Sequence, residues 1–231
     1  MKTPRTREEL EAEIEGGWQP EFVFFYGSHP SPDGRITESC LSQWWEAPFT
    51  VDGVKYHTAE HYFMASKAAL FGDHDILARI LASPHPLQAK TLGRQISGFN
   101  EDIWLRHRMG FTVTGNHAKF SQDSALCDYL LSTGDLVLVE ASPEDAIWGI
   151  ARSAQDPASL DPRQWRGLNL LGFALMEVRD ILRNEKFREG FPSRDKSGRI
   201  SLPLASDASF LHEKDLELPE LRRADPHAFF P

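Results

Sequence analysis

The sequence predicts an α+β fold, a compact and mainly helical single domain around a small sheet. Helical patterns outnumber strand-like runs along the chain, and the strands do not alternate regularly with helices as a doubly wound sheet requires. The 231 residues are 41% hydrophobic and 11% aromatic, which suffices for a buried core and is too apolar for a disordered chain. We expect a helical appendage at 1–21, the main domain at 22–187 and a polar extension at 188–231.

The individual elements follow from capping residues, apolar runs and turn dipeptides. Thr58 is a helix N-cap and Gly72 a helix stop, whereas an Asp-Gly pair between apolar residues favours a tight hairpin. Such signals predict, in chain order, a helix from Thr6 to Gly16, a buried strand in FVFFYG (22–27), a hairpin turning at Asp52-Gly53, helices over 59–71, 86–97, 101–109 and 117–131, a strand in LVLVEA (136–141), a helical turn from Ser142 and a final helix over 170–186.

Composition and charge restrict the class of protein. A net charge of −9 and a pI near 5.5 leave no basic surface for general duplex binding, although a local cationic pocket is compatible with them. No apolar run approaches the roughly 20 residues of a membrane span, and the charged start lacks the apolar stretch of a signal peptide. We therefore expect a cytoplasmic protein. The two cysteines, Cys40 and Cys127, are too few for a disulfide framework and are expected to be buried.

The predicted helix TAEHYFMASKAALFGD carries the most informative pair of polar residues. Glu60 and Lys67 are seven positions apart, which places them within about 20° of one helix face and about 10 Å apart along the axis. Phe63 and Met64 lie between them, so a lysine buried there would shift toward the neutral, nucleophilic amine. The alternative is structural: Glu60 complements the helix dipole and Lys67 extends into water.

The same helix start also fits H-x-x-E-H, a zinc-peptidase pattern, at His57 to His61. That pattern needs both histidines inside one helix, whereas Thr58 is the expected cap and leaves His57 outside. We therefore expect His61 to be a hydrogen-bonded residue of the site wall or the core.

A cationic island is expected between residues 90 and 119. Lys90 and Arg94 share a helix face through their i, i+4 spacing and are suited to hold a phosphate, unless they form a solvated helix face. The other members of the island are Arg106, Arg108 and Lys119.

The last group of polar residues follows the strand LVLVEA. Glu140 ends this strand, and Asp145 either bonds back to the Ser142 cap or holds a ligand together with Trp148. Farther along, Gly167-Leu168-Asn169 offers close backbone approach and a side-chain amide.

These segments, taken in order, resemble the NADAR domain, or YbiA-like, family over about Phe22 to Arg183. The matching motifs are FVFFYG, LSQWWEAPF with VDGVKY, TAEHYFMASKAALFGD, KTLGR, the Trp104 region, AKF, LVEASPEDAIWGI and WRGLNLLGFALMEVRDIL. Two departures affect the expected specificity. Gln43 stands where the family usually has asparagine, and the 150–165 segment after Trp148-Gly149 departs from the usual loop.

The resemblance implies a compact α+β fold and an N-glycosidase that acts on ribosylated bases, without metal or cofactor. Two substrate classes are associated with the family: ribosylamino-pyrimidine intermediates of riboflavin synthesis, and ADP-ribose on guanine, as a nucleotide or in single-stranded DNA. The implied mechanism has Lys67 form a Schiff base with ribose, Glu60 act as general acid and base, and Asp145 orient the ribose. A non-catalytic ADP-ribose- or NAD-binding module is the alternative. Substrate-binding roles are expected for Phe24, Tyr26, Ser42, His61, Arg94, Trp148, Gly149 and Asn169.

Overall fold

The computed structural model describes residues 3–190, 193–194 and 200–201. The chain divides into two units, Met1–Phe187 and Arg188–Pro231, and each is described by itself. In the second unit β5 (Ser193–Arg194) pairs antiparallel with β6 (Ile200–Ser201). The rest of the predicted C-terminal extension lies outside the described residues.

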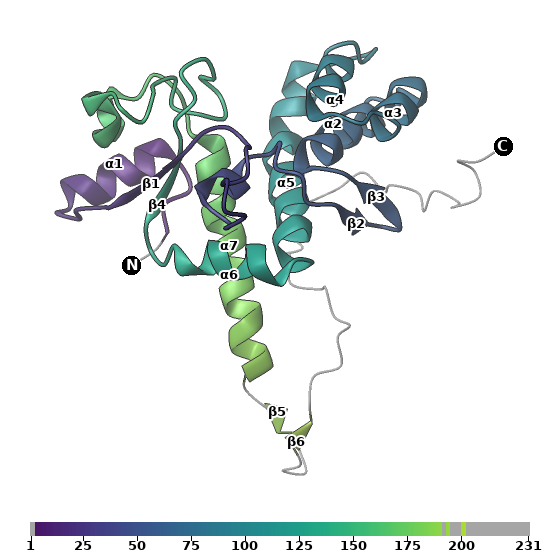
Figure 1. The fold of residues 1–231 in the computed structure, drawn as a ribbon. Helices are drawn as coiled ribbons and strands as arrows, with labels where there is room; N and C mark the ends of the chain where they lie inside the picture. Colours follow the sequence, from purple (N-terminus) through teal and green to yellow (C-terminus); the bar gives the residue numbers. More distant parts are fainter. Residues whose placement is uncertain (1–2, 191–192, 195–199, 202–231) are drawn as a thin grey trace. The chain divides into compact units, whose positions relative to one another are not determined.

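Helices dominate the first unit, and two short two-stranded sheets accompany them (Figure 1), which confirms the predicted α+β class. Helix α7 continues past the end of this unit. The elements are α1 (Arg7–Glu15), β1 (Phe22–Phe25), η1 (Glu38–Leu41), β2 (Phe49–Val51), β3 (Val54–Tyr56), α2 (Ala59–Leu70), α3 (His74–Leu81), α4 (Pro86–Gly93), α5 (Glu101–Ser121), α6 (Ser124–Ser132), β4 (Val137–Glu140), η2 (Pro157–Leu160), η3 (Pro162–Gln164) and α7 (Leu170–Gly190).

The first sheet joins strands that are far apart in the sequence. Strand β1 pairs parallel with β4, from Phe22 opposite Val137 to Phe25 opposite Glu140. Residues 137–139 are fully buried, as the continuous apolar run predicted. Because the strands are parallel, their carboxyl ends lie at one edge, and the chain beyond Phe25 starts next to Glu140.

The predicted hairpin is confirmed. Strands β2 and β3 pair antiparallel, with Val51 opposite Val54. Asp52 and Gly53 form the turn with φ of 50° and 80°, the left-handed conformations that a two-residue type I′ turn needs.

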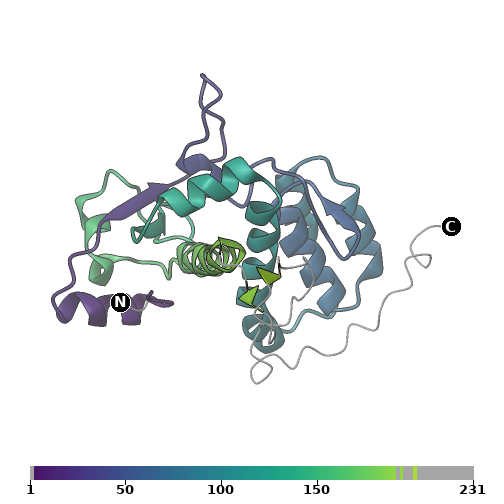
Figure 2. The same ribbon diagram turned by 90° about the horizontal axis from the view of Figure 1, so that it is seen from below.

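Helix α7 runs through the larger of the two main cores, and Figure 2 views it end-on. Its first turn lies against β4 so closely that a Cβ added to Gly172 would overlap the Leu138 carbonyl oxygen. Helix α1, expected to be an appendage, packs onto the same core through Leu10, whose side chain is fully buried. Arg5, just before α1, bonds Asp180 of α7 at 3.2 Å.

A second core surrounds α2. Helices α3, α4 and α5 all contact α2, and Figure 1 shows them gathered on the side of the hairpin. Eight of the twelve α2 residues are buried, so Glu60 and Lys67 belong to a helix that is enclosed along most of its length.

The structure corrects several predicted boundaries. Helix α3, capped by Asp73, was not predicted. The expected helices over 101–109 and 117–131 are largely helical, but their division is wrong. Helix α5 runs unbroken through Gly115, whose missing Cβ lets Tyr62 pack against it, and α6 follows as a separate helix. The expected helical turn at Ser142 is also wrong, because the Asp145 carboxylate accepts the backbone N–H groups of that loop. Helix α4 ends earlier than expected, and α7 ends later.

The two cysteines, Cys40 and Cys127, are free and buried, as predicted. Within the described part of the chain, no helix combines the length and apolar character needed to cross a membrane.

Two glycine substitutions are expected to have opposite effects on stability, because Gly172 lies in the contact between α7 and β4 and Gly110 lies in open space on α5. Gly172→Ala should lower the free energy of unfolding by about 1–3 kcal/mol, because the added methyl displaces the Leu138 carbonyl. Gly110→Ala, in the open interior of α5, should raise it by about 0.5–1 kcal/mol through helix propensity. Urea unfolding followed by circular dichroism measures both, and equal effects would contradict the assigned contact.

Candidate active site

Glu60 lies in the first turn of α2, where Thr58 caps the helix and its hydroxyl accepts the His61 N–H. The Glu60 residue is only 6% exposed, and burial raises the pKa of its carboxyl to about 7. Lys90 and Arg94 oppose this shift, as does a hydrogen bond from the Trp44 side chain. Glu60 therefore exchanges protons near neutral pH.

Lys67 is half-buried near the other end of α2. Its ammonium donates a hydrogen bond to the Gly93 carbonyl at 2.9 Å and lies 4.4 Å from the centre of the Phe99 ring and 5.5 Å from that of Trp104. Burial lowers the pKa of this amine. The shift favours the neutral, nucleophilic form.

A second carboxyl, that of Glu140, faces the same region from the end of β4; the residue is half-buried, and its Oε2 atom is buried. Burial raises its pKa to about 8, and the nearby Asp145 and Glu60 carboxylates raise it further while Lys90 lowers it. The structure thus brings Glu60, Glu140, Asp145 and Lys90 together. No site role is predicted for Glu140 from the sequence, although a carboxylate directly after the apolar run LVLV is a signal that points to it.

The loop after β4 is held in place by Asp145 and by glycine. The Asp145 carboxylate accepts the N–H groups of Ile147 at 2.9 Å and Trp148 at 2.8 Å, rather than a bond from Ser142. Gly149 passes the Glu140 carbonyl so closely that an added Cβ would lie 2.7 Å from its oxygen. Asp145 and Trp148 therefore have fixed positions beside Glu140.

Aromatic rings lie between Lys67 and the three neighbouring carboxyl groups of Glu60, Glu140 and Asp145. Trp148 packs edge-on against Phe63 with ring centres 5.1 Å apart, and Phe63 packs on Trp104 at 5.0 Å. Trp104 is one of the two rings beside the Lys67 ammonium. The guanidinium of Arg108 lies 6.0 Å from the centre of the Trp148 ring.

The segment that carries Trp44 is anchored by α5. Lys119 is 1% exposed and donates to the carbonyls of Cys40 at 2.6 Å and Ser42 at 2.8 Å. Lys119 is therefore not part of the cationic island expected from the sequence; burial lowers its pKa to about 7. The Asn116 side chain donates to the Gln43 side chain at 2.8 Å.

Gln43 and Trp44 in turn contact Glu60. The Gln43 carbonyl accepts the Glu60 backbone N–H at 3.0 Å, while the Trp44 side chain bonds its carboxyl. The residue that departs from the usual family asparagine thus joins α5 to the first turn of α2.

Two of the predicted substrate-binding residues use their polar atoms inside the protein. Asn169 is fully buried, donates to the Leu138 carbonyl at 2.9 Å and accepts the Glu140 N–H at 3.0 Å. His61 bonds the Thr58 hydroxyl at 2.8 Å and the Ser83 carbonyl at 3.0 Å.

The other residues predicted to bind substrate range from partly buried to exposed. The Ser42 hydroxyl accepts the Trp44 N–H at 3.1 Å. Phe24 packs on the larger core, whereas Tyr26 is 63% exposed just beyond β1, at the sheet edge that carries Glu140. Arg94 is exposed at the end of α4.

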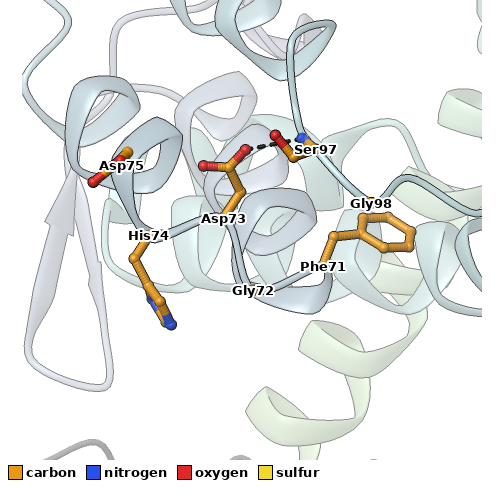
Figure 3. A pocket seen from close by; sticks show the side chains of 7 residues that line it. All are labelled: Phe71, Gly72, Asp73, His74, Asp75, Ser97 and Gly98. Carbon is orange, nitrogen blue, oxygen red and sulfur yellow. Dashed lines mark hydrogen bonds between the residues drawn. The ribbon is translucent and has the colours of Figure 1, made fainter.

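Two hollows flank α2. The one in Figure 3, of about 450 Å³, adjoins the carboxyl end of the helix, and the Asp73 carboxylate within it accepts the Ser97 N–H at 2.9 Å. The other, of about 360 Å³, adjoins the amino end and shares Trp44 with the Glu60 site. It is lined by Ser28, His29, Pro30, Trp44, Trp45, Glu46, His57, Thr58, Pro84, His85 and Pro86.

The H-x-x-E-H pattern does not form a cluster of ligands. His57 precedes α2, Glu60 bonds Trp44, and both ring nitrogens of His61 have protein partners. Among the described residues, no group of three or more His, Cys, Asp or Glu is arranged to hold a metal ion.

Comparisons with known proteins match most of this chain. It is 39% identical to N-glycosidase R617 of Acanthamoeba polyphaga mimivirus over 165 residues, 69% of this chain and 95% of that protein. It is 34% identical over 139 residues to N-glycosidase YbiA of Escherichia coli (strain K12), covering 60% and 78% of the two chains. A riboflavin biosynthesis protein of Vibrio vulnificus is 31% identical over 160 residues, 69% of this chain and 38% of that protein.

A solved structure shows the same fold. The NMR structure of E. coli YbiA superposes with a TM-score of 0.59 at 29% identity and covers 74% of this chain and 89% of its own. The NADAR domain model matches residues 24–183, nearly the span expected from the motifs. This chain belongs to the NADAR domain family.

Proposed function

We propose that this protein is an N-glycosidase, a hydrolase that cleaves the bond between a ribose and a base, with Lys67 as the nucleophile. The observation that carries the proposal is the pairing, on α2, of a partly buried amine with a buried carboxyl. Burial shifts the pKa of Lys67 downward, toward the neutral amine that a nucleophile needs, and raises that of Glu60 to about 7, where a carboxyl can both give and take a proton. The names of the relatives R617 and YbiA support this class of reaction.

In the proposed reaction, the neutral Lys67 amine attacks the anomeric carbon of the ribose. The bond to the base breaks, the sugar ring opens, and the resulting Schiff base is hydrolysed by water. Glu60 moves protons among the attacking groups, the ring oxygen and the leaving base. Asp145 stabilises the positive charge that develops on the ribose, because its carboxylate is held beside Glu60 by the 147 and 148 amides.

The substrate is proposed to be a phosphorylated ribosyl-base. Trp148 supplies a ring on the Lys67 side of the carboxyls, and Tyr26 is exposed at the same sheet edge. Lys90 and Arg94 supply positive charge near Glu60. The hollow bordered by Trp44 gives room for the part of the substrate beyond the anomeric carbon. Both a ribosylamino-pyrimidine phosphate and ADP-ribosylated guanine meet these requirements.

The role of Lys67 predicts a covalent adduct. Borohydride added during turnover should reduce the Schiff base and attach the ribosyl group to Lys67, as peptide mass spectrometry would show. Lys67→Ala should lower kcat by at least roughly 10³-fold in a folded protein and abolish the adduct. Lys55→Ala, at an exposed lysine of β3, is the matched control and should change neither result. Full activity of Lys67→Ala would disprove the nucleophilic role.

The substrate class is decided by base release. The protein is offered a ribosylamino-pyrimidine phosphate, ADP-ribosylated guanosine and ADP-ribosylated single-stranded DNA, and the free base is measured by liquid chromatography. We expect release from at least one, with the Arg94→Ala variant raising KM for that substrate more than it changes kcat. Tight calorimetric binding without base release from any of them would indicate a binding module instead.

A further inference from the structure

Glu140 is a half-buried carboxyl next to Glu60 and Asp145 to which the proposed reaction assigns no role. Its backbone is held on three sides: its N–H donates to Asn169 at 3.0 Å, its carbonyl accepts the Ile150 N–H at 3.0 Å, and the next residue bonds the Phe25 carbonyl at 2.9 Å. The side chain therefore starts from a rigid point at the end of β4.

The Glu140 carboxyl has an oxygen, Oε2, that is buried and has no hydrogen-bond partner among the described residues. The charged groups that face it are Asp145 in the following loop, Lys90 of α4 and Glu60 of α2. A buried polar atom without a partner is unusual in a native protein and destabilises it unless a ligand completes the bond. An unpaired, protonated carboxyl beside the site is suited to donate a proton to a bound ligand.

The proposed reaction needs such a donor. When the Lys67 amine bonds to the anomeric carbon, the electron pair of the breaking bond stays on the base nitrogen, which must gain a proton. In the same step the attacking amine must lose one. Glu60 acting alone would have to be protonated for the first transfer and ionised for the second within one step, so a second carboxyl would divide the proton transfers assigned above to Glu60.

We propose that Glu140 is a second catalytic carboxyl, the general acid that protonates the leaving base, while ionised Glu60 accepts the proton from the attacking amine. This inference rests on the proposed function of the site. After base departure Glu140 is ionised and Glu60 is protonated. Hydrolysis of the Schiff base consumes one water and releases no net proton, so transfer of a proton from Glu60 to Glu140 restores the pair.

The environments of the two carboxyls support this assignment of roles. Burial raises the pKa of Glu140 to about 8 and that of Glu60 to about 7. The Trp44 hydrogen bond and the nearby Lys90 and Arg94 favour the ionised form of Glu60, whereas Oε2 of Glu140 has no donor among the described residues, so Glu60 is the carboxyl that ionises first. The active state has one proton, on Glu140. Activity should therefore rise with pH as Glu60 and the Lys67 ammonium lose their protons, and fall as pH passes about 8 and Glu140 ionises.

The test compares Glu140→Gln with the wild type in two reactions. Base release should fall by roughly 10²- to 10⁴-fold in kcat with KM little changed, and the decline above about pH 8 should disappear. Ribose 5-phosphate, an aldehyde sugar with no base to expel, should still be trapped on Lys67 by borohydride as in the wild type. Glu144→Gln, at an exposed carboxyl of the same loop, is the matched control and should behave as the wild type in both.

The outcomes separate Glu140 from the rest of the mechanism. Equal loss of base release and of sugar trapping would assign Glu140 a structural role, and unchanged base release would exclude it as the acid. Failure of the wild type to trap either sugar counts against Lys67 and the proposed function. If Glu140→Gln does not fold, Glu140→Asp replaces it and should keep the alkaline limb with a reduced kcat.

A stability measurement supplies an independent readout. Because burial raises the folded-state pKa of Glu140 above its unfolded value, the wild type should lose stability as pH rises toward and through about 8. Glu140→Gln cannot ionise, so its melting temperature relative to the wild type should be higher at pH 9 than at pH 5. A pH-independent difference would overturn the assignment of a buried, protonated carboxyl.

Discussion

The removal of charged groups from water is the constraint on which the site depends. Glu60 and Glu140 come from different elements, one from the start of α2 and the other from the end of β4, and burial raises the pKa of each into the neutral range. Lys67 experiences the opposite shift for the same reason, since burial disfavours its ammonium form. Burial thus shifts the pKa values of both carboxyls and of the amine in the directions that the proposed reaction needs.

The scaffold maintains this environment with polar contacts that are themselves buried. On one side, Lys119 and Asn116 of α5 hold the segment that presents Gln43 and Trp44 to Glu60. On the other, Asn169 bonds both β4 and the Glu140 backbone. In the proposed reaction these residues would act only by positioning Gln43, Trp44 and Glu140. The donor groups of Lys119, Asn116 and Asn169 all bond within the fold, whereas the Glu140 carboxyl oxygen Oε2 is buried without a partner among the described residues.

Element types were largely predictable, and boundaries less so. Local signals such as the Thr58 cap and the Asp52-Gly53 turn act within a few residues, and the structure contains both. The continuity of α5 was not predicted because Gly115 weakens a helix in isolation. In the folded protein, Tyr62 of α2 fills the space that the missing Cβ leaves. The loop at 142–149 was expected to begin with a helical turn. The turn does not form because the Asp145 carboxylate bonds the loop N–H groups that a helix would have used.

The sequence by itself determined the α+β class, the family and the placement of Glu60 and Lys67 on one face of α2, because these depend on local periodicity and on motifs in order. Only the tertiary structure decided that Glu140 lies beside Glu60 and Asp145. It also decided that Lys119 is buried against the backbone of Cys40 and Ser42, and that the Asn169 amide bonds the backbone of β4. Burial and pKa depend on which distant segments meet: β1 with β4, and α2 with the segment that carries Trp44. No window of sequence contains that information, since desolvation is a property of the packed site as a whole.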